Sequence, residues 1–209
     1  MVIFAKNARI NDNAQLTQLL AELTDVVWDI VLFSETRAKS GQQILDGGHM
    51  LYTSLEDNQF AGVGILLHSK HVKKSNRIHV FSGRVLALDV CIGGSRIRAV
   101  AVYLPHCGYD VQFFDEAYEQ IRCAVDQGRK KHRKIILGGD FNTQANIGYR
   151  GMQLQSLIDS FGLCITNHLD TPWDLQWTFQ SMMGIRRKID FILVSATFEP
   201  LHPDLQMCF

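Results

Sequence analysis

The stretch Ile135-Ile-Leu-Gly-Gly-Asp-Phe-Asn-Thr143 decides how this chain is interpreted. It begins with a short apolar run, which is typical of a buried β-strand. Gly138 and Gly139 then allow another chain or a ligand to approach the backbone closely. Asp140 and Asn142 follow two positions apart, and on an extended strand end they would point to the same side. The stretch therefore predicts either a polar site at a strand end or an ordinary turn, because Gly, Asp and Asn are common turn residues.

The overall composition is that of a globular protein without a membrane segment. The 209 residues include 46% hydrophobic and 20% charged side chains, and the net charge is zero. No stretch approaches the roughly 18 apolar residues that a membrane span requires. The five cysteines are scattered without a Cys-x-x-Cys pair, which argues against a disulfide framework or a zinc site and favours an intracellular, reducing compartment. A dedicated non-specific nucleic-acid binder would be basic overall, whereas positive charge here is confined to local clusters such as 186–188.

Apolar patterns along the chain predict a mixture of helices and strands. Helical spacing is found over 13–23, 111–127 and 151–161. Strands are expected over 2–5, 29–34, 62–68, 85–92, 97–103, 135–137 and 189–194, with a hairpin at the glycine pair 93–94. No repeat or flexible linker interrupts this order, so residues 1–209 are expected to form one α+β or sandwich-type domain.

Polar residues that can act on a phosphate follow several of the predicted strands. They are Asn7, Glu35, Tyr103 with His106, Asp140 with Asn142, and Asp190. A glutamate that closes a buried strand is costly unless it is paired or bound to a metal. The recurrence of such residues at strand ends therefore favours a functional site over isolated turns.

In their order along the chain, these motifs resemble the endonuclease/exonuclease/phosphatase superfamily of deoxyribonuclease-I-like and apurinic-endonuclease-like proteins. In residues and spacing, the motifs are most similar to those of the endonuclease domains of non-LTR retrotransposons. The resemblance implies an α/β (α+β) fold, a four-layer αββα sandwich in which two mainly antiparallel sheets are flanked by helices. The matching signatures are Asn7-Ala-Arg9, Phe33-Ser-Glu-Thr-Arg37, Val102-Tyr-Leu-Pro105, Gly138-Gly-Asp-Phe-Asn142, Trp177-Thr-Phe179 and Ile189-Asp-Phe-Ile-Leu-Val-Ser195.

The resemblance also implies a role for each of the leading side chains. Glu35 would be the main ligand of Mg²⁺, or of Mn²⁺ in its place, and Asn7 would help to hold the metal or the scissile phosphate. Asp140 would orient or deprotonate the attacking water, and Asn142 would hydrogen-bond a phosphate oxygen. Tyr103 would place its hydroxyl on the phosphate. The alternatives are a turn cap for Glu35, a turn residue for Asn7 and a core aromatic for Tyr103.

Four further residues complete the expected site. His106 can donate a hydrogen bond or a proton to the phosphate, and the alternative is a surface histidine without a role. Asp190 corresponds to the aspartate that orients a catalytic histidine in the family. Thr178 and Arg187 are expected to bind the substrate, Thr178 from the Trp-Thr-Phe motif and Arg187 from the basic cluster.

One part of the family pattern is missing from the sequence. The closing Ser-Asp-His segment does not occur, and His202-Pro-Asp204 has the reversed order. We therefore expect either a chain cut short before its last strand or a degenerate copy. In both cases the metal site would remain and cleavage would be weak or absent, because members of a catalytic set act as a unit.

The leading functional hypothesis is a Mg²⁺-dependent phosphodiester hydrolase of retroelement type that nicks DNA in the nucleus or cytoplasm. It would be followed by a reverse-transcriptase domain in a longer protein. Basic clusters would contact DNA phosphates, and loops over 37–59 and 172–187 would select the target. The alternatives are a catalytically dead remnant that binds nucleic acid weakly, and a phosphatase or phosphodiesterase of the same superfamily with another substrate.

Overall fold

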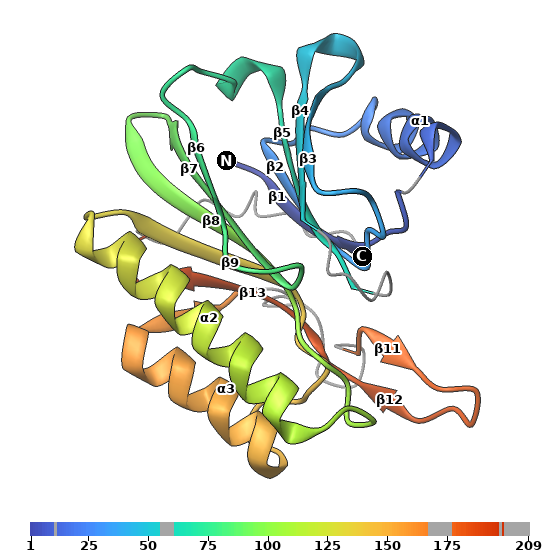
Figure 1. Ribbon diagram of the computed structural model, residues 1–209, viewed down its shortest axis with the longest axis vertical. Coiled ribbons are helices and arrows are strands. Elements are labelled where there is room, and N and C mark those ends of the chain that lie inside the picture. Colours follow the sequence, from blue (N-terminus) through green and yellow to red (C-terminus); the bar gives the residue numbers. More distant parts are fainter. Residues whose placement is uncertain (11, 55–60, 167–176, 197, 199–209) are drawn as a thin grey trace.

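The computed structural model describes the chain except residues 11, 55–60, 167–176, 197 and 199–209, and it has four layers (Figure 1). Two sheets pack face to face through a shared core. Helix α1 (Asn13–Leu23) covers the outer face of one sheet, and helices α2 (Val111–Lys130) and α3 (Gly148–Phe161) cover the outer face of the other. The predicted sandwich of two mainly antiparallel sheets flanked by helices is therefore confirmed. The stretch His202-Pro-Asp204, which has the reversed order of the family motif, lies outside the described residues.

The first sheet has the strand order β1-β2-β5-β4-β3. Only β1 and β2 run parallel to each other. Side chains of the interior strand β2 alternate between the two faces, since Leu32 packs against the second sheet and Phe33 packs under α1. The strands are β1 (Ile3–Asn7), β2 (Ile30–Ser34), β3 (Gly41–Ile44), β4 (Met50–Ser54) and β5 (Val63–Leu67).

The second sheet has the strand order β10-β13-β9-β8-β7-β6, and only β8 and β9 are parallel. Helix α2 provides the crossover that a parallel pair requires. A separate two-stranded hairpin of β11 (Phe179–Gln180) and β12 (Arg186–Arg187) projects from the body of the protein (Figure 1). The strands are β6 (Arg77–Val80), β7 (Val85–Ile92), β8 (Ser95–Tyr103), β9 (Lys134–Asp140), β10 (Leu163–Ile165) and β13 (Asp190–Ser195).

Two glycines of β9 allow the close packing that their sequence predicts. A β-carbon on Gly138 would lie 2.8 Å from Cδ1 of Leu32 in the facing sheet. A β-carbon on Gly139, whose φ is +140°, would lie 2.0 Å from the carbonyl oxygen of Val102. Larger residues at these positions would push the sheets apart or displace β8, so the glycines fix the approach of β9 just before Asp140.

Some expectations for connecting segments are wrong. Residues 37–59 were expected to form a loop, yet they contain β3, β4 and the 3₁₀ helix η1 (Asp46–Gly48). Strand β3 has the sequence GQQI and is exposed throughout, so it carries no apolar alternation by which a strand is identified. The helical spacing over 151–161 also places Met152 on the face that was expected to be buried, whereas 59% of its surface is exposed in α3.

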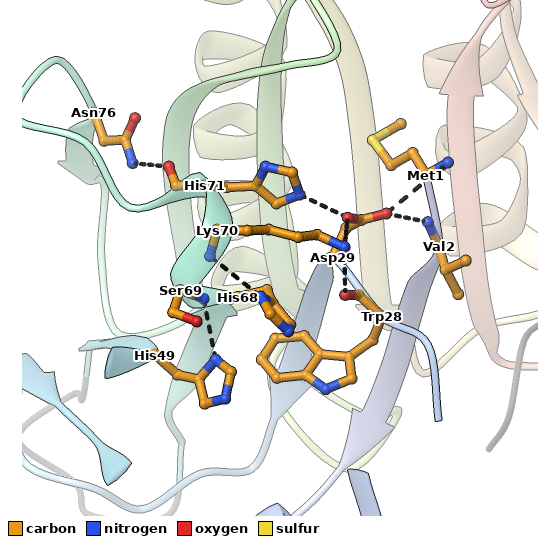
Figure 2. Close-up of polar contacts among 10 residues, drawn as sticks. All are labelled: Met1, Val2, Trp28, Asp29, His49, His68, Ser69, Lys70, His71 and Asn76. Carbon is orange, nitrogen blue, oxygen red and sulfur yellow. Dashed lines mark hydrogen bonds and ion pairs between the residues drawn. The ribbon is translucent and has the colours of Figure 1, made fainter. Parts of the chain in front are cut away.

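A polar cluster lies around Asp29 at the start of β2 (Figure 2), whereas Glu35 follows the last residue of this strand. Asp29, just before β2, accepts hydrogen bonds from the backbone nitrogen of Val2 at 2.6 Å and from His71 at 2.6 Å, and it pairs with Lys70 at 2.8 Å. These contacts tie the start of β1 and the 3₁₀ helix η2 (Ser69–His71) to β2. The cluster therefore stabilises the fold at the end of β2 opposite to the candidate site.

Candidate active site

Three of the expected site residues form a row across the second sheet. Tyr103 is the last residue of β8, Asp140 the last of β9 and Asp190 the first of β13. Tyr103 is the register partner of Asp140, and Asp140 is the register partner of Asp190. Register partners on neighbouring strands lie about 5 Å apart and point to the same face. The structure therefore brings these three residues together at the ends of neighbouring strands.

The first sheet contributes Glu35 and Asn7 from its two parallel strands. Asn7 ends β1 and is the register partner of Ser34, so Glu35 follows directly at the neighbouring strand end. Glu35 has a φ of 58°, a left-handed conformation that is uncommon outside glycine and marks a sharp change of direction. Its charge acts on Tyr103, Asp140 and Asp190. Glu35 thus belongs to the same cluster although it comes from the facing sheet.

Burial, together with the crowding of acidic groups, raises pKa values in the cluster. Burial, followed by the negative charges of Asp190 and Glu35, raises the pKa of Asp140 from 3.8 to about 8, while hydrogen bonds from Asn142 oppose the shift. Burial and the charge of Glu35 raise the pKa of Asp190 to about 6. Burial and the charges of Glu35 and Asp140 also raise the pKa of the Tyr103 hydroxyl. Groups with such perturbed pKa values concentrate at functional sites.

Asn142 contacts Asp140, but by a different route from the one expected. The strand ends at Asp140, and Asn142 has a φ of 50°, so the extended geometry assumed for the pair is wrong. The backbone nitrogen of Asn142 donates to Oδ1 of Asp140 at 2.8 Å, and its Nδ2 donates to Oδ2 of Asp140 at 3.1 Å and to the carbonyl of Leu104 at 2.8 Å. Asn142 therefore holds both carboxylate oxygens of Asp140 and links them to the segment after β8.

Thr178 and Arg187 have different surroundings: Thr178 is hydrogen-bonded to the start of β13, and Arg187 is exposed. Oγ1 of Thr178 accepts the backbone N–H groups of Ile189 and Asp190, both at 3.0 Å. Arg187 is exposed on β12, opposite Phe179. Thr178 thus fixes the start of β13, while Arg187 projects into solvent. The expected loop over 172–187 is a hairpin in its described part, and residues 172–176 lie outside the described residues.

His106 lies in the exposed loop after β8. Its ring centroid is 4.7 Å from that of Tyr109, and its Nδ1 accepts the backbone N–H of Gly108 at 3.0 Å. These contacts hold the imidazole against its own loop, beside the strand end that carries Tyr103.

Arg84 is part of this region, and sequence reasoning missed it. It precedes β7, and only 5% of its surface is exposed. Its guanidinium carbon lies 5.3 Å from the ring centroid of Tyr103 and 5.4 Å from that of Tyr109. The sequence signal was weak, because a single arginine at the start of an apolar strand matches no motif.

A two-sheet sandwich with an acidic cluster where strand ends from both sheets meet is the arrangement expected of a deoxyribonuclease-I-like protein. Sequence comparison identifies the group more specifically. Residues 6–207 match the Endonuclease/Exonuclease/phosphatase family, and the chain belongs to this family. No curated protein sequence matches the chain significantly.

Several solved structures share the fold. The 3′ phosphatase NExo from Neisseria, bound to a product DNA hairpin, is 18% identical with a TM-score of 0.67, and the match covers 94% of this chain and 86% of that chain. The endonuclease domain of TRAS1, a telomere-specific non-LTR retrotransposon, is 17% identical with a TM-score of 0.64 and coverages of 92% and 85%. The AP endonuclease LMAP from Leishmania major is 14% identical with a TM-score of 0.71 and coverages of 93% and 78%. At these identities the similarity shows the fold.

Proposed function

We propose that this protein is a metal-dependent phosphodiester hydrolase of retroelement type that nicks DNA. The observation that carries the proposal is the meeting of Glu35, Asp140, Asp190 and Tyr103 at strand ends of two sheets, with raised pKa values for the last three. Acidic groups that destabilise one another in this way are suited to a site that receives positive charge. Membership of the Endonuclease/Exonuclease/phosphatase family supports a hydrolase.

The donor set fits Mg²⁺ or Mn²⁺. Both ions prefer carboxylate, amide and water oxygens, and Glu35 with Asn7 supplies the carboxylate and the amide. In the described part of the chain, no three His, Cys, Asp or Glu side chains are grouped closely enough to enclose a metal ion. Mg²⁺ is usually held by one or two carboxylates together with waters and substrate phosphates. When bound, the cation would offset charge on the phosphate and on the leaving oxygen.

The chain's own residues would divide the remaining work. Asp140 would accept the proton of the attacking water once positive charge nearby has lowered its pKa. Asn142 would keep the carboxylate of Asp140 in place through the two hydrogen bonds described above. The Tyr103 hydroxyl, which its raised pKa keeps protonated, would donate a hydrogen bond to a phosphate oxygen. Asp190, held by Thr178, would add a second carboxylate on the same side.

Two observations favour DNA as the substrate. The hairpin that contains Thr178 carries the exposed residues Arg186 and Arg187, which would contact backbone phosphates beside the cluster. Among proteins with the same fold, NExo is bound to a DNA hairpin and TRAS1 is a retrotransposon endonuclease. The TRAS1 similarity and the wording of the motifs support the retroelement type, in which a reverse-transcriptase domain would act together with this one.

The test is nicking of supercoiled plasmid in Mg²⁺, in Mn²⁺ and in EDTA. We expect weak metal-dependent nicking that falls to background in Glu35→Gln and in Asp140→Asn. The matched control is Asp159→Asn, which removes an exposed carboxylate at the end of α3. Parallel assays with a 3′-phosphorylated oligonucleotide, RNA and a small phosphate ester identify the substrate class. Absence of hydrolysis of all these substrates would refute the proposal and favour a remnant that only binds nucleic acid.

A further inference from the structure

We propose that Arg84 is a positioning residue that holds the ring of Tyr103 so that its hydroxyl faces the acidic cluster. The proposal rests on the function proposed above, because it assigns Tyr103 a task that requires a fixed ring. It concerns the arrangement of the site before substrate arrives and does not require Arg84 to touch the substrate.

Arg84 binds Tyr103 through both its backbone and its side chain. The backbone nitrogen of Tyr103 donates to the carbonyl of Arg84 at 3.0 Å, and Nη1 of Arg84 donates to the carbonyl of Tyr103 at 3.4 Å. The guanidinium also lies over the Tyr103 ring, with Cζ 5.3 Å from the centroid. The same side chain therefore contacts the strand end and the aromatic ring that continues from it.

A second ring completes the arrangement. Tyr109, in the loop after β8, also lies within cation–π distance of the Arg84 guanidinium, at 5.4 Å. This loop is anchored independently by Arg150, whose guanidinium donates to the carbonyl of Pro105 at 2.7 Å and to the carbonyl of Tyr109 at 2.9 Å. Tyr109 is thus fixed by a different residue and offers Arg84 a stable second contact.

The surroundings of Arg84 are fixed as well. Its backbone nitrogen donates to Oγ of Ser82 at 3.1 Å, and this hydroxyl donates to Oε1 of Gln120 in α2 at 2.6 Å. The side chain has only 5% of its surface exposed, and a cation–π contact is stronger when it is shielded from water. The backbone of Arg84 is therefore held by a hydrogen-bonded turn, and its guanidinium is held by two aromatic rings.

Charge and shape both matter in this position. After burial, the charges of Glu35 and Asp140 raise the pKa of the Tyr103 hydroxyl, and the positive charge of Arg84 lowers it. A guanidinium is planar and stacks on aromatic rings, whereas a lysine ammonium is a compact charge that does not stack in this way. A lysine would therefore keep the charge and lose most of the ring contact.

The test compares Arg84→Ala, Arg84→Lys and the wild type by nicking kinetics, with chemical rescue. We expect kcat to fall roughly 10- to 100-fold in Arg84→Ala while KM changes little, because misplacement of a reacting group affects the chemical step. Millimolar guanidinium should restore part of kcat, whereas urea, a neutral planar molecule of similar shape, should not. Arg122→Ala, which removes a half-exposed arginine of α2, should show neither the loss nor the rescue.

A readout independent of activity keeps the proposal testable if the wild type does not cleave. Fluorotyrosine placed at position 103 gives a ¹⁹F resonance that reports the environment of the ring. In Arg84→Ala this resonance should shift and broaden, and guanidinium should reverse the change while urea does not. An unchanged resonance, or equal effects of guanidinium and urea, would overturn the positioning role. Lack of nicking by the wild type, with the ¹⁹F result as expected, would instead contradict only the proposed function.

Discussion

The stability of the metal-free protein should decrease with increasing pH because of Asp140, and Asp140→Asn should remove most of this decrease. Asp140 is 5% exposed, and its pKa in the folded protein is raised from 3.8 to about 8. Between these values the folded protein retains a proton that the unfolded chain has released. The free energy of unfolding therefore falls as the pH rises through this interval, since the unfolded state binds fewer protons.

The size of the effect follows from the width of that interval. A difference of one bound proton changes the free energy of unfolding by about 1.4 kcal/mol per pH unit. From about pH 5 to about pH 8 the upper limit is therefore about 4 kcal/mol. The pKa of Asp190 is also raised, to about 6, so Asp190 adds a smaller decrease of its own between about pH 5 and pH 6. The part of the decrease that Asp140→Asn removes is therefore expected to be at most about 4 kcal/mol.

The measurement is urea-induced unfolding in EDTA at several pH values, for the wild type and for Asp140→Asn. Subtracting the two curves removes the contributions of other titrating groups, including His49 and His68, whose pKa values are lowered chiefly by burial. Asp159→Asn is the matched control and should follow the wild type. Added Mg²⁺ should flatten the wild-type curve and leave the variant nearly unchanged. Parallel curves for the wild type and Asp140→Asn across this range would refute the assignment of a buried, protonated carboxyl at this position.

Three further outcomes are expected. Gly139→Ala should lower the melting temperature strongly in a thermal unfolding scan, because its β-carbon would lie 2.0 Å from the Val102 oxygen. Gly41→Ala, in the exposed strand β3 with nothing within 4 Å of the added β-carbon, should have a small effect, and similar shifts for both would contradict the close-approach argument. Arg98→Met should reduce the free energy of unfolding in urea by about 3 to 5 kcal/mol, because Arg98 is 0% exposed and binds both oxygens of Asp89. A loss below about 1 kcal/mol would show that the pair is not buried as described. Asp29→Asn should lower the free energy of unfolding by about 2 kcal/mol at neutral pH, because burial would raise the pKa of Asp29 but its bonds to His71, Lys70 and Val2 lower it to about 2. This lowered pKa stabilises the fold above about pH 4, so the difference in stability between the variant and the wild type should disappear in acid. A difference that persists at about pH 2 would argue against these bonds as its cause.

The main strands could be predicted because the sequence carries their physical cause. The strand over 85–92 matches the prediction residue for residue, because a long apolar run bounded by glycines is typical of a buried strand. Strand β3 could not be found in this way, because its side chains are polar and exposed and its pairing with β4 depends on tertiary contacts. Apolar patterns therefore reveal the centre of the sheets better than their edges.

The sequence predicted that Tyr103, Asp140 and Asp190 belong together, and the structure places them at neighbouring strand ends, but their local geometry could not be predicted. Asp140 and Asp190 were identified as single residues, yet the register that makes them neighbours across β9 and β13 is a property of the folded sheet. The turn at Asn142 arises because its backbone N–H bonds to the Asp140 carboxylate, a local competition that strand periodicity ignores. Arg84 was missed because its partners Tyr103 and Tyr109 lie far away in the sequence.

The origin of the acidic cluster in two sheets has a consequence for biosynthesis. Glu35 and Asp190 stand near opposite ends of the described chain, and they meet only after both sheets have formed and packed. Contacts of such long sequence separation form late and slowly during folding. A partly synthesised or partly folded chain would lack the complete cluster, so the proposed cleavage of nucleic acid would be confined to molecules that have finished folding.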